Sequence, residues 1–508
     1  MSPDQLFAVA ESNHWEALFP EIILACGALF LLVCEIILPK DRHRHIPQFA
    51  VLVQAAALVG VALNFNSPEN WSREPLFGGL IHLSPLGQVG RVFFLASSLL
   101  VSFLAGVCLP RSRMPRVEFY HIVLVVTAAM MLLVQSNHFV MFFVALETVT
   151  VGFYILVSYY RDRALTLEAG LKYLVLGSLS SGILLFGIVL LYGAVGRAVD
   201  GTGLVHTGFE FGAVAAFLQR NPDSFLALTG VLLVLSGVAF KIGAFPFQIW
   251  IPDVYQGAPT PVTAFLAVSS KAAGFGVLLI LVQNVFAPLR DVLVPVLSTL
   301  AAATIIFGNL SALSQRNAKR LMGLSGVSHA GFLLIGVTAS FTVSWAAGAV
   351  WFYLFTYMLA SMAVFGVMAH VVGDDDADQE LDSYNQLAKE RPFLAAVLAA
   401  GVGSLAGIPP LAGFIGKLLV FIAAFEAHLY GLLAFAIAGV VLSIYYYFGW
   451  IKAAFFATWQ LPAKAGGPPV AGRTVPTALG VVVLGGLALA TVLIGFFQQP
   501  LTSWLALK

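Results

Sequence analysis

Long apolar runs recur along the whole chain, separated by short polar connections. A helix needs about 20 mainly apolar residues to cross a bilayer. About fourteen runs meet this length, and their approximate bounds are 18–38, 47–66, 86–109, 117–134, 137–159, 168–193, 225–250, 260–285, 291–313, 318–340, 345–371, 392–426, 429–456 and 474–497. The pattern predicts an all-α polytopic membrane protein that forms a single membrane domain over residues 1–508.

Two of these runs contain helix breakers. The run 392–426 is too long for one plain span and holds Gly407, Pro409 and Pro410, and Pro246 interrupts the run 225–250. Proline removes a backbone donor and clashes with the preceding turn, so it ends or kinks a helix. Broken helices at membrane depth are tolerated where they line a polar cavity. We therefore expect two broken helices beside polar sites.

The two breaks lie in different halves of the chain, and each lies near a lysine. Paired interruptions of this kind are typical of internal repeats in transporters. The segments 117–285 and 291–456 would form the two repeats, with five spans each. Because five is odd, the second repeat must be inverted relative to the first.

Charges in the loops indicate the orientation. One set of alternating loops, which includes 40–44, 111–116, 161–163, 316–320, 389–391 and 464–473, carries fifteen Lys and Arg residues, and the other set carries five. Cytoplasmic loops are the ones enriched in Lys and Arg. Both termini are therefore expected on the periplasmic side. Residues 1–16 contain no Lys or Arg, so the first apolar helix is expected to be retained rather than cleaved as a signal.

Composition agrees with a membrane protein. Of the 508 residues, 59% are hydrophobic and 10% are charged, and the mean hydropathy is +0.92. Soluble domains carry roughly 25% charged residues. We therefore expect membrane lipids around most of the chain. A net charge of +1 provides no basic patch, so nucleic acid is not an expected partner.

Four ionisable residues lie near the middle of apolar runs, namely Glu147, Lys241, Lys271 and Lys417. A charged side chain at the bilayer centre costs roughly 2.5–3.5 kcal/mol on the insertion scale. Four isolated charges would therefore cost roughly 10–14 kcal/mol. A helix bundle keeps such groups only if they face water or one another.

Two interpretations of these charges are open. One pair, such as Glu147 with Lys241, could simply join two helices, and the whole chain could be a scaffold. Three lysines cannot all pair with one glutamate, however, and desolvation disfavours an unpaired ammonium. Neighbouring groups of this kind titrate as a coupled set, which a proton relay requires. Pro246 should also free a backbone carbonyl near Lys241 that could solvate the ammonium, so the pattern favours a relay.

His329 is a further candidate for the relay. It lies between Lys271 and Lys417 in the sequence, in a Ser/Gly-rich run where Ser325 and Ser328 could hold water. A lone histidine in a helix is often a satisfied core residue. A neutral imidazole can also pass a proton between two partners, and we favour that role here.

Other polar groups have simpler interpretations. Arg91 is expected to extend to the outer interface, because long basic side chains reach toward water. Glu168 and Lys172 have the spacing of a structural helix pair. The tyrosines 445–447 could form an interfacial belt or line a water path. The acidic loop 372–391 is expected to be solvated, with docking of a soluble partner as the alternative.

Four sequence stretches resemble a known family. The stretch FKIGAFPFQIWIPDVYQGAPTPVTAFLAVSSKAAGF, from Phe240 to Phe275, is similar to the signature of the proton-translocating antiporter-like subunits of NADH-quinone oxidoreductase (respiratory complex I). RNAKRLMGLSGVSHAGFLLIG and GIPPLAGFIGK resemble the same family, and LDSYNQLAKERP resembles its subunit N. The resemblance covers nearly the whole chain.

The resemblance implies a role for each candidate residue. Glu147 matches the essential glutamate of the fifth helix, and Lys241 matches the lysine of the broken seventh helix that pairs with it. Lys271 matches a bridging lysine, His329 a connecting position between half-channels, and Lys417 the terminal lysine at the exit. These residues would translocate protons, coupled to electron transfer from NADH to quinone in other subunits. The implied location is the bacterial inner (plasma) membrane, among the other membrane-arm subunits.

No cofactor or metal is expected in this chain. Its three cysteines, Cys26, Cys34 and Cys108, form no CxxC motif, whereas an iron–sulfur cluster needs about four thiolates. No GxGxxG motif opens a strand–helix unit, so no nicotinamide site is predicted. By the resemblance, FMN, iron–sulfur clusters and quinone belong to partner subunits.

The alternative assignment is a subunit of a Na⁺(K⁺)/H⁺ antiporter complex. Such complexes, and the sibling subunits of the oxidoreductase, usually carry a histidine after the aspartate of the PD motif. Here Asp253 is followed by Val, Tyr255 and Gln256, which favours subunit N. One buried carboxylate among several lysines is also a poor ligand set for a metal cation.

Overall fold

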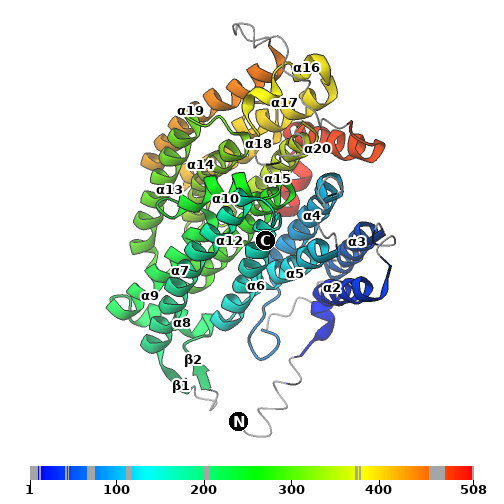
Figure 1. The fold of residues 1–508 in the computed structure, drawn as a ribbon. Helices are drawn as coiled ribbons and strands as arrows, with labels where there is room; N and C mark the ends of the chain where they lie inside the picture. Colours follow the sequence, from blue (N-terminus) through cyan, green and yellow to red (C-terminus); the bar gives the residue numbers. More distant parts are fainter. Residues whose placement is uncertain are drawn as a thin grey trace.

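The computed structural model describes residues 10, 13–39, 43, 45–65, 75–109, 117–199, 205–371, 376, 379–456 and 475–505. The basic residues of the loops 40–44, 111–116 and 464–473, and most of the acidic residues at 374–378, lie outside this part. The helices, drawn in Figure 1, are α2 (Phe19–Ile37), α3 (Ile46–Phe65), α4 (Pro85–Cys108), α5 (Val117–Leu133), α6 (Phe139–Val157), α7 (Ala164–Val195), α8 (Phe211–Arg220), α9 (Phe225–Ile242), α10 (Ile251–Gly257), α11 (Thr260–Phe265), α12 (Lys271–Ile280), α13 (Arg290–Leu313), α14 (Ala318–Ala339), α15 (Ala346–Val371), α16 (Leu387–Glu390), α17 (Pro392–Ala406), α18 (Ala412–Glu426), α19 (Tyr430–Phe455), α20 (Ala478–Phe496) and α21 (Gln499–Leu505). The helical fold class is confirmed, with one short antiparallel hairpin, β1 (Arg197–Val199) and β2 (Val205–Thr207), between α7 and α8.

Twelve helices in the described part of the chain are long and apolar enough to cross a membrane. Two of the fourteen predicted spans are not among them. The span predicted at 117–134 is α5, which has 17 residues, and the one at 392–426 is divided into α17 and α18. The break predicted in this last span is confirmed, and so is the break near Pro246, where α9 ends before η5 (Phe247–Trp250) and α10 begin.

Three spans form the centre of the bundle. In the most apolar window of each span, the buried share of the residues is 94% for 260–285, 100% for α14 and 94% for α15. In α20, by contrast, only 22% of the window is buried, and its remaining apolar side chains face outward. A helix that is apolar all round and buried belongs to the interior, whereas one with an exposed apolar face suits contact with lipid or another subunit. Figure 1 shows α12, α14 and α15 among the other helices.

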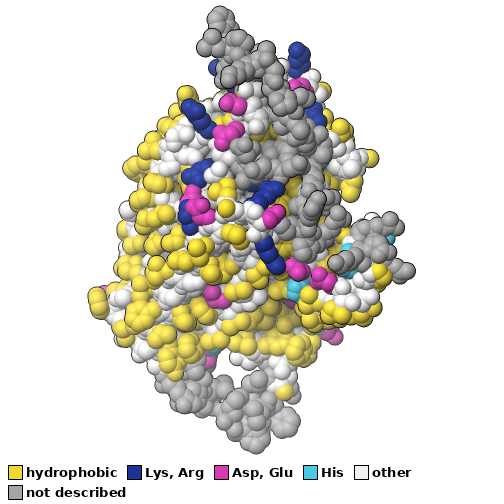
Figure 2. Space-filling view, viewed as in Figure 1, with side chains coloured by type: hydrophobic (Ala, Val, Ile, Leu, Met, Phe, Trp, Pro, Cys, Tyr) yellow, Lys and Arg dark blue, Asp and Glu magenta, His cyan; other side chains and the backbone are white. Residues whose placement is uncertain are grey.

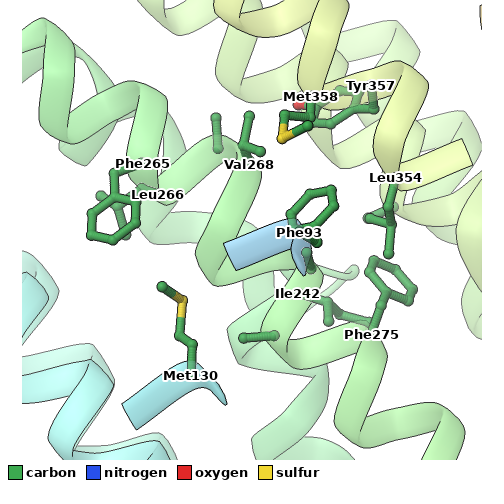
Figure 3. Close-up of a cluster of buried hydrophobic side chains, with 14 of the residues drawn as sticks. Phe93, Met130, Ile242, Phe265, Leu266, Val268, Phe275, Leu354, Tyr357 and Met358 are labelled. Carbon is green, nitrogen blue, oxygen red and sulfur yellow. The ribbon is translucent and has the colours of Figure 1, made fainter. Parts of the chain in front are cut away.

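Helices distant in the sequence share this core. Figure 3 draws a cluster of buried hydrophobic side chains that includes Phe93 of α4, Ile242 of α9, Phe275 of α12 and Leu354 of α15. A Cβ added to Gly274 would lie 2.6 Å from the Ile242 side chain, so α9 and α12 approach closely. Dense packing of this kind keeps the two helices, each of which bears a lysine, in one relative position.

The charged surface is uneven. In the face drawn in Figure 2, Lys and Arg side chains gather in the upper part, where Figure 1 places α10 and α16. The lower part of this face is mostly hydrophobic, and the β1–β2 hairpin lies at that end. The distribution parallels the loop asymmetry of the sequence, while the orientation in the membrane stays a prediction.

Arg91 does not extend to an interface, so that prediction is wrong. Its side chain is fully buried and forms an ion pair of 2.5 Å with Glu21. The guanidinium also donates to the backbone oxygen of Ala17 and to Gln88, while Gln135 donates to Glu21. The carboxylate at the start of α2 therefore neutralises Arg91 and ties α2 to α4 and to the turn that follows α5.

Candidate functional site

The same backbone motif ends the helix before each break. Gly243, after α9, has a φ of 73°, and Gly407, after α17, has a φ of 83°. The residue following each glycine donates its N–H to a carbonyl five residues earlier, to Ala239 at 2.9 Å and to Gly403 at 3.0 Å. This is the Schellman end of a helix, which needs a left-handed residue and therefore favours glycine. The local sequence at each break thus specifies where the helix ends.

Lys241, in the last turn of α9, is buried with 7% of its surface exposed. Its Nζ donates to Thr150 Oγ1 of α6 at 2.6 Å. The carbonyl oxygen of Phe240, one residue before Lys241, accepts hydrogen bonds from the N–H of Gly243 at 3.1 Å and from the Trp250 indole at 3.3 Å. The hydrogen bond of Lys241 thus goes to a hydroxyl, and its solvation by the carbonyl that Pro246 frees stays a prediction.

Glu147 lies one turn before Thr150 on α6 and is half-buried rather than buried. Its Oε1 accepts a hydrogen bond of 2.6 Å from Ser181 of α7. Although Glu147 is near enough for its charge to attract Lys241, the two form no ion pair in the structure. Val144 on the same helix is 55% exposed, so α6 lies at the edge of the bundle. The predictions that Glu147 is buried and pairs directly with Lys241 are both wrong.

Lys271 lies in the most enclosed part of the molecule. It follows a π-helical segment, η6 (Leu266–Ser270), and π segments are frequent at functional sites. Its Nζ donates to the carbonyl oxygen of Gly326 at 2.5 Å and lies 5.2 Å from the centre of the Tyr357 ring. A Cβ at Gly326 would be 2.8 Å from Nζ, so glycine makes room for the ammonium.

His329 is buried between two tyrosine hydroxyls. Its Nδ1 is 2.7 Å from the Tyr353 oxygen, and its Nε2 is 3.1 Å from the Tyr447 oxygen. A neutral imidazole donates through one nitrogen and accepts through the other, so it can connect the two hydroxyls in a hydrogen-bonded chain. Ser328, expected beside the histidine, instead accepts from Asn309. Sequence reasoning missed Tyr353, because nothing along α15 distinguishes it from a core aromatic residue.

The structure separates the two interpretations of the three consecutive tyrosines. Tyr447 contacts His329, and Tyr446 donates to Asn309 at 3.0 Å, so both face inward. Tyr445 is 74% exposed. Successive residues on a helix point about 100° apart, so one run of tyrosines can serve an internal path and an outer surface.

Lys417 is held by the other half of its own broken helix. Its Nζ donates to the carbonyl oxygens of Leu405 and Ala406 at 2.9 and 3.0 Å. These are the last carbonyls of α17, where the helix dipole favours a positive charge. The ammonium also lies 5.1 Å from the centre of the Phe332 ring.

Three of the candidate groups form a row in which one aromatic ring separates each from the next. Tyr357 lies between Lys271 and His329, with its ring centre 5.0 Å from the centre of the histidine ring. Phe332 lies between His329 and Lys417, with its ring centre 6.3 Å from that of the histidine. The structure therefore brings Lys271, His329 and Lys417 together.

The other two candidates join this row from one side. Lys241 belongs to α9, which packs against α12, and Glu147 lies on α6 beyond it. The described residues contain no cluster of His, Cys, Asp or Glu that could hold a metal ion. The chemistry available to these groups is the binding and transfer of protons through hydroxyls, an imidazole and amines.

A second charged cluster lies outside this row. Lys172 forms the predicted pair with Glu168 at 2.7 Å. Lys172 also contacts Asp253 at 2.7 Å, and Asp253 in turn pairs with Arg320 at 2.7 Å. These groups tie α7, α10 and α14 together, and the helix pair predicted from spacing is confirmed as one part of this network.

Comparison with known proteins gives a consistent result. Residues 136–443 match the family described as "NADH:quinone oxidoreductase/Mrp antiporter, TM". A protein of Opitutus terrae named "NADH-quinone oxidoreductase subunit N 1" is 63% identical over 499 residues, which are 98% of each chain. A protein of the same name from Rhizobium meliloti is 34% identical over 438 residues, 86% of this chain and 87% of that one.

Solved structures show the same fold. A chain of "Respiratory complex I from Thermus thermophilus with bound Aureothin" is 31% identical, with a TM-score of 0.77 over 96% of this chain and 99% of that one. A chain of the Mrp complex from Dietzia sp. DQ12-45-1b has a TM-score of 0.79 at 20% identity, over 97% of this chain and 96% of that one. The second likeness concerns the fold alone.

Proposed function

Because the chain belongs to the subunit N family of NADH-quinone oxidoreductase, within the wider NADH:quinone oxidoreductase/Mrp antiporter family, we propose that it moves protons across the membrane through Glu147, Lys241, Lys271, His329 and Lys417. It is a multi-pass membrane subunit of an H⁺-translocating enzyme. Electron transfer from NADH to quinone takes place in partner subunits, which hold FMN, iron–sulfur clusters and quinone. The chain lies in the bacterial inner membrane among other membrane-arm subunits, with both termini periplasmic.

The observation that carries this proposal is the neutrality of the groups that hold the buried lysines. In the described part of the chain, Lys241, Lys271 and Lys417 form no ion pair, and their hydrogen-bond acceptors are a hydroxyl and backbone carbonyls. Lysines that merely join helices would be expected opposite carboxylates, because breaking a buried pair is costly. An ammonium bound to a neutral acceptor can instead lose and regain its proton without leaving a buried carboxylate unpaired.

The order of the groups suggests how a signal enters. Glu147 carries a carboxylate on a mainly apolar, partly exposed face of α6, and such a position suits contact with a neighbouring membrane-arm subunit. A change in the charge of Glu147 acts electrostatically on Lys241, which is close because it binds Thr150, one turn after Glu147 on α6. The proton then moves from Lys241 to Lys271, His329 and Lys417, and leaves on the far side.

The proposed path is made of two halves, one in each of the two predicted repeats. The segments 117–285 and 291–456 would each contribute five spans, and the fourth span of each is the broken one. The same glycine-ended motif opens both breaks. Inverted repeats with broken helices at the substrate path are a general design of transporters.

Buried ammonium groups also bear on the Na⁺(K⁺)/H⁺ antiporter alternative. Three lysines on one path repel a metal cation, whereas they can carry protons. The 63% identity to a subunit N protein points the same way, since the likeness to the Mrp complex concerns only the fold.

The experiment that tests the proposal is the double variant Glu147→Gln, Lys241→Met in the assembled complex. We expect NADH-driven acidification of inverted vesicles to be lost while the amount of assembled complex stays the same. The matched control is Lys452→Met, since Lys452 is an exposed lysine near the end of α19. Normal proton pumping by the double variant would reject the relay.

A further inference from the structure

Asp376 departs from the behaviour expected of the acidic loop. It lies between α15 and η9 (Leu381–Tyr384), and only 17% of its side chain is exposed. Its carboxylate accepts hydrogen bonds from the backbone N–H of Thr260 at 2.6 Å and from Thr260 Oγ1 at 2.5 Å. It also lies 3.2 Å from Lys319 Nζ, and the Lys319 side chain is completely buried. The prediction of a solvated loop is therefore wrong for Asp376.

The two partners of Asp376 lie at the starts of two of the three central spans. Thr260 is the first residue of α11, which opens the buried span that carries Lys271. Lys319 is the second residue of α14, and its Nζ also donates to the carbonyl oxygen of Ala258 at 2.8 Å. A carboxylate at a helix N-terminus is stabilised by the free N–H groups and the helix dipole. Asp376 thus clasps the starts of two neighbouring helices.

The span that begins at Thr260 and helix α14 contact each other a second time, at Lys271. Lys271 Nζ donates to Gly326 O of α14 at 2.5 Å. At 1.5 Å per residue, Lys271 lies roughly 16 Å along its span from Thr260, and Gly326 roughly 10 Å along α14 from Lys319. The contact at Lys271 is therefore a second tie between the helices that Asp376 joins at their starts. Sliding one helix along the other would break the relay contact, which depends on a short, directed hydrogen bond.

The surrounding segment is built onto α14. Ala318 donates its N–H to Gln379 O at 2.7 Å, and Leu381 donates to Arg316 O at 2.8 Å. Tyr384 donates its hydroxyl to the fully buried Gln379 at 2.8 Å. These contacts present Asp376 to its partners from a fixed support.

Electrostatics agree with this geometry. Burial alone would raise the pKa of the Asp376 carboxyl, but the Lys319 ammonium and the Thr260 hydrogen bonds outweigh burial and lower that pKa. The group is therefore charged at neutral pH and available to the clasp.

We propose that Asp376 is a positioning residue for the proton relay: by clasping Thr260 and Lys319 it sets the register of the Lys271 helix against α14. The inference rests on the proposed function, since it assumes that Lys271 carries protons. Asp376 itself touches none of the relay groups. Its effect on transport passes through the placement of Lys271 Nζ beside Gly326.

The test uses the double variant Asp376→Ala, Lys319→Met in the assembled complex. This variant removes the clasp without leaving a buried, unpaired ammonium, which the single Asp376→Ala variant would do at a higher cost. We expect normal assembly and about tenfold slower NADH-driven proton pumping, because small displacements of a reacting group have effects of this size or larger. The matched control is Asp382→Ala, an exposed aspartate of the same segment, which should pump normally.

A conservative variant separates positioning from simple folding. Asp376→Asn with Lys319→Met keeps an amide oxygen that can accept from Thr260. We expect it to recover part of the pumping that Asp376→Ala with Lys319→Met loses, at equal amounts of assembled complex. Equal pumping by the Asn and Ala versions would contradict the role of the Thr260 contact.

The variant Lys271→Met is measured in parallel to distinguish two kinds of failure. If Lys271→Met is inactive while Asp376→Ala with Lys319→Met assembles and pumps normally, the positioning role is overturned and the proposed function stands. Failure of that double variant to assemble would also overturn it, because the clasp would then serve only folding. If Lys271→Met pumps normally, the proposed function itself fails, and the inference fails with it.

Discussion

The two helix breaks end in the same backbone motif, but their lysines find different partners. At the first break, Lys241 precedes the left-handed glycine and turns to Thr150 on α6. At the second break, Lys417 follows the glycine and reaches back to the last two carbonyls of α17. Trp250 donates to the carbonyl of Phe240, three residues before the first glycine, whereas Lys417 uses the two carbonyls directly before the second glycine.

The difference shows two ways to hold a charge inside an apolar bundle. Lys417 caps the helix that its own break created, so its acceptors are backbone atoms that no single substitution removes. Lys241 depends on a side chain from another helix, and that side chain lies one turn from Glu147. Lys241 is therefore open to the influence of a neighbouring charge, whereas Lys417 is held within its own broken helix.

The largest expected effect comes from removing the side-chain acceptor of Lys241. Thr150→Val keeps the shape of the side chain but deletes the hydroxyl. A hydrogen bond to a charged group contributes about 1.5–3 kcal/mol, so we expect pumping to fall roughly tenfold or more. The measurement is the initial rate of NADH-driven acidification of vesicles at equal amounts of complex.

Thr148→Val is the matched control for that change. Thr148 is exposed, and its hydroxyl donates to Val144 of its own helix. It should pump at the unmodified rate. Equal losses in the two variants would show that the contrast between the breaks does not lie in the partner of Lys241.

A second, smaller effect is expected at the glycines. Alanine in a left-handed conformation costs about 1–2 kcal/mol, so both Gly243→Ala and Gly407→Ala should lower the temperature at which the complex dissociates. A Cβ at Gly407 would lie 2.9 Å from Lys417 Cδ, so this variant should also slow pumping. A Cβ at Gly243 would lie 2.3 Å from Ile251 Cδ1, so its effect should fall mainly on stability.

Ile251→Val sharpens this difference, because it removes the methyl group nearest the new Cβ. Combined with Gly243→Ala, it should restore part of the lost stability. The same change should not help Gly407→Ala. Recovery in both backgrounds, or in neither, would mean that backbone strain alone explains the effects.

The smallest effect is expected at Tyr447, a hydrogen-bond partner of His329. Tyr447→Phe removes the hydroxyl 3.1 Å from His329 Nε2, and a neutral hydrogen bond contributes about 0.5–1.5 kcal/mol. Pumping should therefore fall a few-fold at most. Tyr445→Phe, on the exposed side of the same helix, should change nothing, and an equal loss in both variants would argue against a role for Tyr447.

Much of the site was predictable because its ingredients are local. Charges inside apolar runs identify Lys241, Lys271 and Lys417, and glycine and proline mark both breaks. The partners were not predictable in the same way. Thr150 lies 91 residues from Lys241 in the sequence, and Tyr353 and Tyr447 lie 24 and 118 residues from His329. Tyr447 belongs to the tyrosine run that could line a water path, but nothing in the immediate neighbours of Thr150 and Tyr353 distinguishes these two from core residues.

The sequence by itself determined the helical membrane class, the two broken helices and the identity of the costly buried lysines, since hydropathy and backbone preferences act over a few residues. Only the tertiary structure decided that Glu147 lies at the edge of the bundle, that Arg91 is buried against Glu21, and that Asp376 clasps two helices. These outcomes depend on which helix faces meet. Helix packing in an apolar bundle is chosen by shape and by the sparse polar contacts between distant segments, which no local pattern records.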